Sequence, residues 1–225
     1  IVLKQNVHSC EEMYVNKQPY TRLLLGTEYA LLRREFITRR RRKRETPEIA
    51  SNVLVTLGGS DPNHLTLRGL KALASLSAGT NTHVVVGSLN SDLDEIRAVV
   101  YRNPEKLRLS VNAAASEMAD AMTEADLAIH AAGTTFWELA CMGVPSISIV
   151  AADNQQDIAD EMEKLGATRN LGWHMNVDVQ KITSAVRRLA SNRNERKAMT
   201  ETMMKLVDGK GASRVVEVLA RDYRG

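Results

Sequence analysis

From Asn52 onward the chain alternates short β-rich runs with helical stretches, and this alternation restricts the possible folds more than any other feature of the sequence. Strands separated by helices are typical of βαβ units, in which the strands are parallel. The runs interpreted as strands are Val53–Leu57, Thr82–Val86, Leu107–Val111, Asp126–His130 and Pro145–Val150. The helices expected with them lie near residues 64–77, 91–102, 116–124, 135–142 and 155–165. The pattern predicts a Rossmann-like, doubly wound parallel sheet of the α/β class.

The chain after Gly166 continues the same kind of structure. A short strand is expected at residues 168–171, followed by helices near 178–191, 193–207 and 211–222. Apolar residues make up 44% of the chain and aromatic residues only 4%, so the core has to be aliphatic. Such a composition suits buried parallel strands that are covered by helices.

The sequence also restricts the compartment in which the protein works. No stretch approaches the roughly 20 uncharged apolar residues that a membrane-spanning helix needs, and no secretory leader opens the sequence. Cys10 and Cys141 lie far apart, without the spacing of metal ligands or of a disulfide framework. We therefore expect a cytoplasmic protein with reduced cysteines and no membrane span.

Residues 1–46 differ from the remainder, because they are polar, contain one apolar run and end in the cation run Arg39–Arg44. A charge run followed by Pro47 is typical of a solvated linker. It provides salt-sensitive, sequence-independent attraction at most, so we expect no specific nucleic-acid partner. We interpret residues 1–46 as the remnant of an N-terminal domain plus a basic linker, and residues 47–225 as a ligand-binding Rossmann-like domain.

Ligands of open parallel sheets bind beyond the carboxyl ends of the strands, so the loops there are the place to look for a site. The first such loop runs from Gly58 to Asn63, and its paired glycines permit a tight turn and a close approach of backbone N–H groups to a ligand. Taken alone, the loop favours an ordinary turn in which Ser60 or Asp61 caps the next helix.

The loop after the fourth predicted strand leads through Gly133 into a helix that opens on Thr134 and Thr135. A helix start offers unpaired N–H donors and the positive end of the helix dipole, which together favour a phosphate. Glu138 stands one turn later on the face of Thr134. This spacing suits a pyrophosphate on the threonines and a ribose diol on the glutamate. Simple capping by Thr134 and a dipole-complementing Glu138 explain the same residues, and the segment alone does not decide.

The loop after the fifth predicted strand is rich in carboxamides, with Asn154 and Gln155 as candidates to face sugar hydroxyls. Capping of the following helix by Asp153 or Asn154 is the alternative. Three polar loops at one edge favour a site more than any one of them does.

The histidines and the remaining motifs add little. His130, at the tip of the fourth predicted strand, is the one histidine that could reach a ligand, but the sequence favours a satisfied histidine at the sheet edge. We expect His83 to be exposed and His64 to face solvent. The sequence contains no metal-ligand constellation, no nucleophile elbow and no P-loop, and its glycines do not form the dinucleotide fingerprint. We therefore expect no metal, nicotinamide or flavin cofactor.

Three segments in order, 23–36 (LLLGTEYALLRREF), 53–66 (VLVTLGGSDPNHLT) and 125–155, resemble the UDP-2,4-diacetamido-2,4,6-trideoxy-β-L-altropyranose hydrolases of pseudaminic-acid biosynthesis. The resemblance covers nearly the whole chain. A more distant resemblance links the chain to the lipid II N-acetylglucosaminyltransferases. Both resemblances imply that the chain is the UDP-binding, C-terminal half of a two-domain GT-B fold.

The resemblance also implies roles for individual residues. Those implied to hold the nucleotide and its phosphates are Gly59, Ser60, Ala115, Gly133, Thr134, Thr135 and Glu138, with Ala115 placed against the uracil and Glu138 on the ribose. Asn154 and Gln155 are implied to face the sugar, and Asn154 is also the tentative catalytic residue. His130 and Ala132 depart from the family pattern, which has smaller residues or glycine at these positions.

In this family water displaces UDP from the anomeric carbon of the sugar, and the expected general base is a histidine in a glycine-rich loop of the N-terminal domain. That loop is absent from the sequence, so the resemblance implies a missing N-terminal domain and an inactive isolated chain. A glycosyltransferase that uses a UDP-sugar, or a nucleotide-binding module without catalysis, are the alternative functions.

Overall fold

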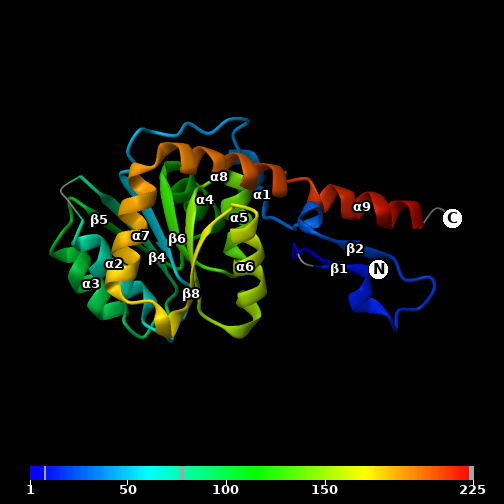
Figure 1. Ribbon diagram of the computed structural model, residues 1–225, viewed down its shortest axis with the longest axis horizontal. Helices are drawn as coiled ribbons and strands as arrows, with labels where there is room; N and C mark the ends of the chain where they lie inside the picture. The colour runs from blue at the N-terminus through cyan, green and yellow to red at the C-terminus, as the bar shows by residue number, and fades with distance from the viewer. Residues whose placement is uncertain (8, 77–78, 223–225) are drawn as a thin grey trace.

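The computed structural model describes residues 1–7, 9–76 and 79–222, and its centre is a sheet of six parallel strands (Figure 1). Across the sheet the strands run in the order β5-β4-β3-β6-β7-β8. Their bounds are β3 Asn52–Thr56, β4 Asn81–Val86, β5 Leu107–Val111, β6 Leu127–Ala131, β7 Ser146–Val150 and β8 Arg169–Trp173. The order changes direction between β3 and β6, as it does in doubly wound folds. The predicted α/β class is confirmed.

Helices cover both faces of the sheet. Because crossovers between parallel strands are right-handed, α2 and α3 lie on one face and α4, α5 and α6 on the other. The later helix α7 packs against α2, and α8 packs against α5. The bounds are α2 Leu65–Ala74, α3 Leu93–Tyr101, α4 Ala115–Glu124, α5 Thr135–Met142, α6 Gln156–Lys164, α7 Val179–Ser191 and α8 Arg193–Leu206. Short 3-10 turns, η3 (Asp153–Gln155) and η4 (His174–Asn176), precede α6 and α7.

Three strands, β6, β7 and β8, begin one residue later than predicted. Asp126 was expected to open its strand, but its carboxylate instead accepts hydrogen bonds from the backbone N–H groups of Ser51 and Asn52 at 3.0 and 2.9 Å. Asp126 therefore holds the amino end of β3 against the amino end of β6. Pro145, which has no N–H to donate, likewise precedes β7.

The core is mainly aliphatic, as predicted, and β6 and β7 are buried along their whole length. Phe36, Phe136 and Trp137 are its large aromatic members. Cys141 lies among them, and burial raises the pKa of its thiol to about 11.

The N-terminal part forms a separate small unit beside the main sheet. Strands β1 (Val2–Lys4) and β2 (Leu23–Leu25) make a two-stranded parallel sheet, with the 3-10 turns η1 (Glu11–Tyr14) and η2 (Thr27–Tyr29) around it. The last helix, α9 (Gly211–Asp222), packs on η2 and extends away from the main sheet (Figure 1). A Cβ on Gly211 would lie 2.2 Å from the carbonyl oxygen of Ala30, so this approach requires glycine.

The segment Arg39–Arg44 is not wholly a solvated linker, and this prediction is wrong for half of its residues. Helix α1 (Arg34–Arg39) packs on α4 and α5, and Arg39 pairs with Asp120 on α4. Arg40 donates to the carbonyl oxygen of Met204 at 2.9 Å, and Arg44 donates to those of Ala125 and Met142. These carbonyls lie at helix C-termini, where unpaired acceptors and the negative end of the dipole attract cations.

Within the described residues, no helix has both the length and the apolar character that a bilayer crossing demands.

Candidate functional site

The three loops singled out by sequence meet at the carboxyl edge of the sheet. Asn63, in the loop after β3, donates through Nδ2 to the carbonyl oxygen of Ala151, in the loop after β7, at 3.1 Å. In the same loop, Gln155 places its Nε2 3.7 Å from the position that a Cβ on Gly133 would take. Gly133 lies in the loop after β6. The loops therefore form one continuous edge, as parallel strand ends predict.

The glycine loop after β3 has a geometric need for small residues. Gly58 has a φ of +106°, a conformation that disfavours side chains. A Cβ on Gly87, which follows β4, would lie 2.4 Å from the carbonyl oxygen of Gly59. The loop is exposed and packs directly against the neighbouring loop, so its N–H groups lie close to any ligand on this edge.

Asp61 caps the helix that follows this loop, α2. Its buried carboxylate accepts from the backbone N–H groups of Leu65 at 3.0 Å and Thr66 at 2.6 Å. The capping alternative is therefore right for Asp61. Because a carboxylate already satisfies the start of α2, this helix start is a poor phosphate site, which leaves Gly59 and the exposed Ser60 as the groups of this loop that can face a ligand.

The start of α5 is different. Thr134 precedes the helix without a side-chain capping bond, and Thr135 is its first residue. Among the described residues no acceptor binds the backbone N–H groups of these two threonines. Two free N–H donors, two hydroxyls and the positive end of a helix dipole therefore face the edge beside Gly133. Of the two helix starts at the centre of the sheet, α5 is the one suited to a phosphate.

Glu138 lies one turn into α5 with its side chain 15% exposed. Its Oε1 accepts from Nε of Arg33 at 3.2 Å and from Nη2 of Arg33 at 2.9 Å. Burial raises the pKa of Glu138, while the hydrogen bonds and charge of Arg33 oppose that rise. Arg33 comes from the segment just before α1 and also stacks 5.0 Å from the ring centroid of Phe36. Sequence reasoning missed Arg33 because it lies far from Glu138 along the chain.

The residues predicted to face the sugar, Asn154 and Gln155, and the residue predicted to contact the uracil, Ala115, lie on either side of Gly133 and Thr134 along this edge. Asn154 is exposed in η3, and Gln155 accepts from the backbone N–H of Ala151 at 3.0 Å, which fixes its amide and leaves its NH₂ toward Gly133. Ala115 is the first residue of α4. There Glu117 accepts from the backbone N–H of Ala114 at 2.8 Å, so the helix start is already partly satisfied.

With this geometry described, comparison with known families decides the family. Residues 52–216 match the glycosyltransferase family 28 C-terminal domain. The chain belongs to this family. The matched residues cover the whole six-stranded sheet, both of its helical layers and the first half of α9.

Individual relatives agree with this family. The chain is 29% identical over 208 residues to the spore coat polysaccharide biosynthesis protein SpsG of Bacillus subtilis, a match that covers 92% of this chain and 60% of SpsG. An uncharacterized protein of Methanocaldococcus jannaschii is 27% identical over 158 residues, which are 69% of this chain and 33% of that protein. The chain therefore spans well under two thirds of the length of these relatives.

Solved structures show the same fold. The MurG structure from Acinetobacter baumannii matches with a TM-score of 0.64 at 21% identity, over 92% of this chain and 58% of MurG. The UDP-GlcNAc 2-epimerase of Neisseria meningitidis, solved with UDP-GlcNAc, matches with a TM-score of 0.58 at 17% identity, over 76% of this chain and 45% of that protein. The family 28 domain thus has the architecture of the C-terminal half of GT-B proteins.

In this family 28 domain, His130 is a core residue and does not face the ligand edge. It is fully buried, its Nδ1 lies 2.8 Å from the carbonyl oxygen of Ala131, and its Nε2 lies 3.1 Å from the hydroxyl of Ser146. Burial lowers its pKa to about 4, so the ring is neutral at neutral pH. The favoured interpretation, a histidine satisfied within the protein, is confirmed, and contact of His130 with a ligand is excluded because its strand is buried on both faces.

This histidine makes the stability of the domain depend on pH. An unfolded histidine titrates near 6.5, so between about pH 6.5 and 4 the unfolded state binds a proton that the native state does not. We expect acidification through this window to lower the free energy of unfolding by about 3 kcal/mol through His130. Urea titrations of the parent and of His130→Gln at several pH values give the free energy of unfolding as a function of pH. The prediction is contradicted if this free energy falls equally with acidification in the two proteins.

Of the two other histidines near the sheet, His83 differs from expectation and His64 agrees with it. His83 is half-buried on β4 and pairs through Nε2 with the hydroxyl of Ser110 at 2.9 Å, so its predicted exposure is wrong. His64 is exposed as predicted, but its Nδ1 lies 2.8 Å from both carboxylate oxygens of Asp92. A carboxylate on one ring nitrogen leaves the other to accept a proton. His64 stands in the loop after β3, at the ligand edge.

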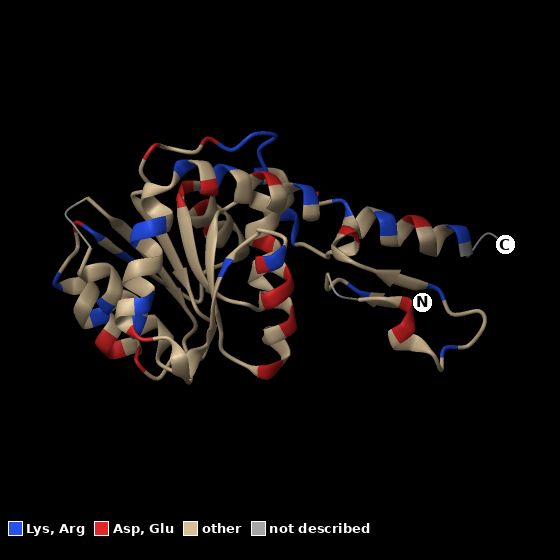
Figure 2. Ribbon diagram, viewed as in Figure 1, with Lys and Arg blue, Asp and Glu red and all other residues tan. Residues whose placement is uncertain are grey.

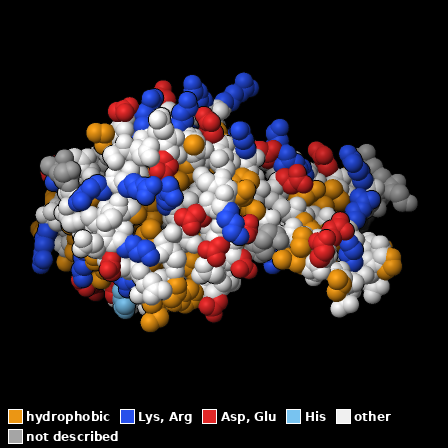
Figure 3. All heavy atoms as spheres, in the orientation of Figure 1, with side chains coloured by type: hydrophobic (Ala, Val, Ile, Leu, Met, Phe, Trp, Pro, Cys, Tyr) orange, Lys and Arg blue, Asp and Glu red, His pale blue; other side chains and the backbone are white. Residues whose placement is uncertain are grey.

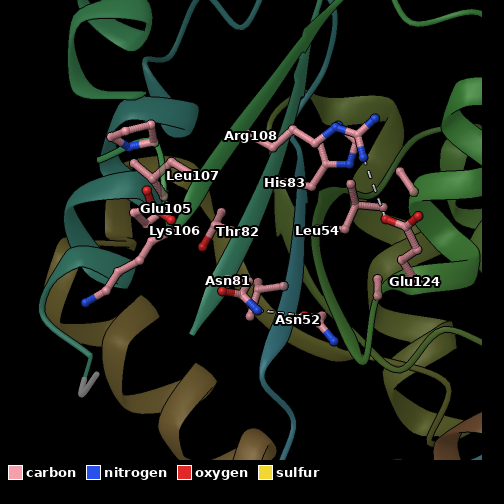
Figure 4. A pocket seen from close by; sticks show the side chains of 14 residues that line it. Asn52, Leu54, Asn81, Thr82, His83, Glu105, Lys106, Leu107, Arg108 and Glu124 are labelled. Carbon is pink, nitrogen blue, oxygen red and sulfur yellow. Dashed lines mark hydrogen bonds and ion pairs between the residues drawn. The ribbon is translucent and has the colours of Figure 1, made fainter. Parts of the chain in front are cut away.

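A pocket of about 180 Å³ lies elsewhere, near the amino ends of β3, β4 and β5 (Figure 4). Its polar wall includes His83, Arg108 and Glu124, and Arg108 pairs with Glu124 at 3.8 Å. It contains none of the residues predicted to bind the nucleotide. No group of three or more metal-binding side chains is found in the described part of the chain.

Proposed function

We propose that this chain binds a UDP-activated sugar and supplies the nucleotide site of an enzyme of polysaccharide biosynthesis. The observation that carries the proposal is the start of α5, where free N–H groups and hydroxyls of Thr134 and Thr135 stand one turn before the carboxylate of Glu138. A pyrophosphate on the helix start would place the adjoining ribose near that carboxylate. The names of SpsG and of the UDP-GlcNAc 2-epimerase support the same class of ligand and pathway.

Each residue at the edge receives a role in this proposal. Gly59 and Ser60 approach the phosphates from the loop after β3, opposite Gly133, Thr134 and Thr135. Glu138 accepts hydrogen bonds from the ribose hydroxyls, and the backbone near Ala115 contacts the uracil. Asn154 and Gln155 face the sugar.

Binding should be selective for UDP. We expect UDP and UDP-sugars to bind, and NAD and flavins not to bind, because the loop after β3 lacks the third glycine of the dinucleotide fingerprint and Asp61 fills the helix start behind it. Calorimetric titration of the purified chain measures this directly. Heat with NAD and none with UDP would overturn the proposal.

For the reaction, we propose hydrolysis of the bond between the anomeric carbon and UDP, as the resemblance of the three segments to pseudaminic-acid pathway hydrolases implies. A second α/β domain would complete the site. Transfer of the sugar to an acceptor is the second candidate, and the match to a glycosyltransferase family favours it. Release of free sugar and UDP without any acceptor, by a protein that contains both domains, supports hydrolysis; release that requires an acceptor supports transfer.

The chain alone should not turn over a UDP-sugar. His130 is fully buried with both ring nitrogens engaged, so it is out of reach of a water molecule at the edge and cannot serve as a base there. A coupled assay for UDP release checks this with the purified chain. Turnover would contradict the prediction, and His64, held by Asp92, would then be the side chain to replace.

A further inference from the structure

A hollow of about 610 Å³ lies between the segment 41–47 and α8. Thr46 and Pro47 lead into β3, and Asp126, also in its wall, precedes β6. Because the strands are parallel, this hollow lies at the amino edge of the sheet, opposite the loops of the nucleotide site. Figure 1 shows the segment passing over α8.

The wall of this hollow is strongly basic. Its cations are Arg41, Arg42, Lys43, Arg44, Arg193 and Lys197, and its acids are Glu45, Asp126 and Glu201. Asp126 is held by the backbone of β3, and the wall keeps an excess of cations with the charge of Asp126 included. Figure 2 shows the segment as a blue stretch of ribbon, and Figure 3 shows blue side chains along the same edge of the molecule. The six cations and three acids of the wall leave a net charge of +3, which is as large as the net charge of the whole chain.

The segment is held in place at both ends. Arg40 and Arg44 donate to carbonyl oxygens at the C-termini of α8, α4 and α5. At the other end, Arg193 donates to the carbonyl oxygen of Thr46 at 2.9 Å, and Arg196 donates to that of Glu48 at 3.2 Å. A segment fastened at both ends presents its cations in a fixed arrangement, which reduces the entropy lost when a ligand binds.

The cations between these anchors have no carboxylate partner. Arg41, Arg42 and Lys43 are exposed, and within the described residues none of them forms an ion pair, nor does Lys197 on the facing helix. Burial, together with the smaller effect of the charge of Arg41, lowers the pKa of Arg44 to about 10 against the opposing charge of Asp126. The six cations of the wall outnumber its three acids, and an anion that binds among them would relieve the repulsion between the cations.

We propose that this hollow is a second ligand site, which binds a compact oligophosphate group. Guanidinium groups pair with phosphate oxygens in two-pronged hydrogen bonds, and a volume of this size is typical of small-molecule sites. A ligand with several adjacent phosphates fits the four unpaired cations better than a single phosphate does. The site is separate from the UDP site, because the two lie at opposite edges of the sheet.

Calorimetric titration with sodium tripolyphosphate, on the chain saturated with UDP and at about 0.15 M ionic strength, tests the proposal. One equivalent should bind, and R41Q/R42Q/K43Q should weaken that binding at least about tenfold. The matched control K71Q/R102Q/R187Q removes the same charge from exposed residues outside the hollow, and it should change the affinity less than about twofold. Circular dichroism verifies that both variants are folded.

Several results would overturn the proposal. These are no binding by the UDP-saturated parent, binding only when UDP is absent, and equal losses in the two triple variants. A fourth is binding of phosphatidylglycerol vesicles without binding of tripolyphosphate, which would make the basic surface a membrane contact instead of a ligand site.

Discussion

Replacing Glu138 by alanine should weaken UDP binding by about ten- to a hundredfold while leaving the melting temperature nearly unchanged. Charge-assisted hydrogen bonds from a ribose diol to this carboxylate contribute roughly 1.5–3 kcal/mol, which sets the size of the loss. The fold should tolerate the change, because a first-turn acid contributes only about 0.3–1 kcal/mol through the helix dipole. Arg33, which loses its partner, has a side chain 52% exposed and can be hydrated instead.

Calorimetry with UDP and thermal melting provide the two measurements. Glu138→Gln should fall between the parent and the alanine variant. Asp94→Ala is a matched control, because Asp94 is also a first-turn acid paired with an arginine, Arg97, at 3.2 Å; it should leave UDP affinity unchanged. A UDP analogue without the ribose diol should bind the parent and Glu138→Ala equally. Unfolding of Glu138→Ala, or parental UDP affinity, would place the ribose elsewhere.

Replacing Arg196 by methionine should destabilise the protein by about 3–5 kcal/mol, the largest loss of stability that we expect from one substitution. Arg196 is fully buried in α8. Its guanidinium donates to the carbonyl oxygens of Leu189 at 2.7 Å and Glu48 at 3.2 Å, and also to those of Ala190 and Pro47. One side chain thus joins the end of α7, the start of α8 and the segment before β3. Methionine fills a similar volume but leaves these acceptors without a donor.

The midpoint of thermal unfolding should fall by roughly 10 °C in Arg196→Met, since 1 kcal/mol corresponds to about 2–4 °C in a chain of this size. Lys197→Met is the matched control, because its side chain is exposed on the same helix; it should stay within about 0.5 kcal/mol of the parent. A midpoint in Arg196→Met close to that of the parent would mean that solvent reaches these carbonyl groups.

Local patterns were sufficient for the strands and helices from β3 onward and for the main sheet, but not for the small sheet of β1 and β2. The strands at 107–111 and the helix at 135–142 have their predicted bounds, because continuous apolar runs and helix-start residues act over a few positions. The same local reasoning located the polar loops, since parallel strands bring their carboxyl ends to one edge whatever the details of packing. The candidate nucleotide residues followed from those loops and from the family resemblance.

What the patterns could not supply are partners that are distant in sequence. Glu138 binds Arg33, and His64 lies against Asp92. Arg40 and Arg44 donate to backbone carbonyls of helices. In each case the partner comes from another element. The sequence of the arginine run alone predicts solvated side chains, because it contains no information about the helix C-termini to which these side chains donate. His130 resembles an edge ligand for the same reason, although its strand is covered on both faces.

The sequence by itself therefore determined the α/β class, the element order from β3 onward and the edge of the sheet at which the candidate site lies, because these depend on periodicity and on strand direction. The tertiary structure alone decided which polar groups at that edge remain free: Asp61 satisfies the start of α2, while Thr134 and Thr135 leave the start of α5 open. It also decided which cations have partners and which line a hollow. Burial and hydrogen-bond satisfaction are properties of what packs around a group, and those neighbours are brought together only when the chain folds.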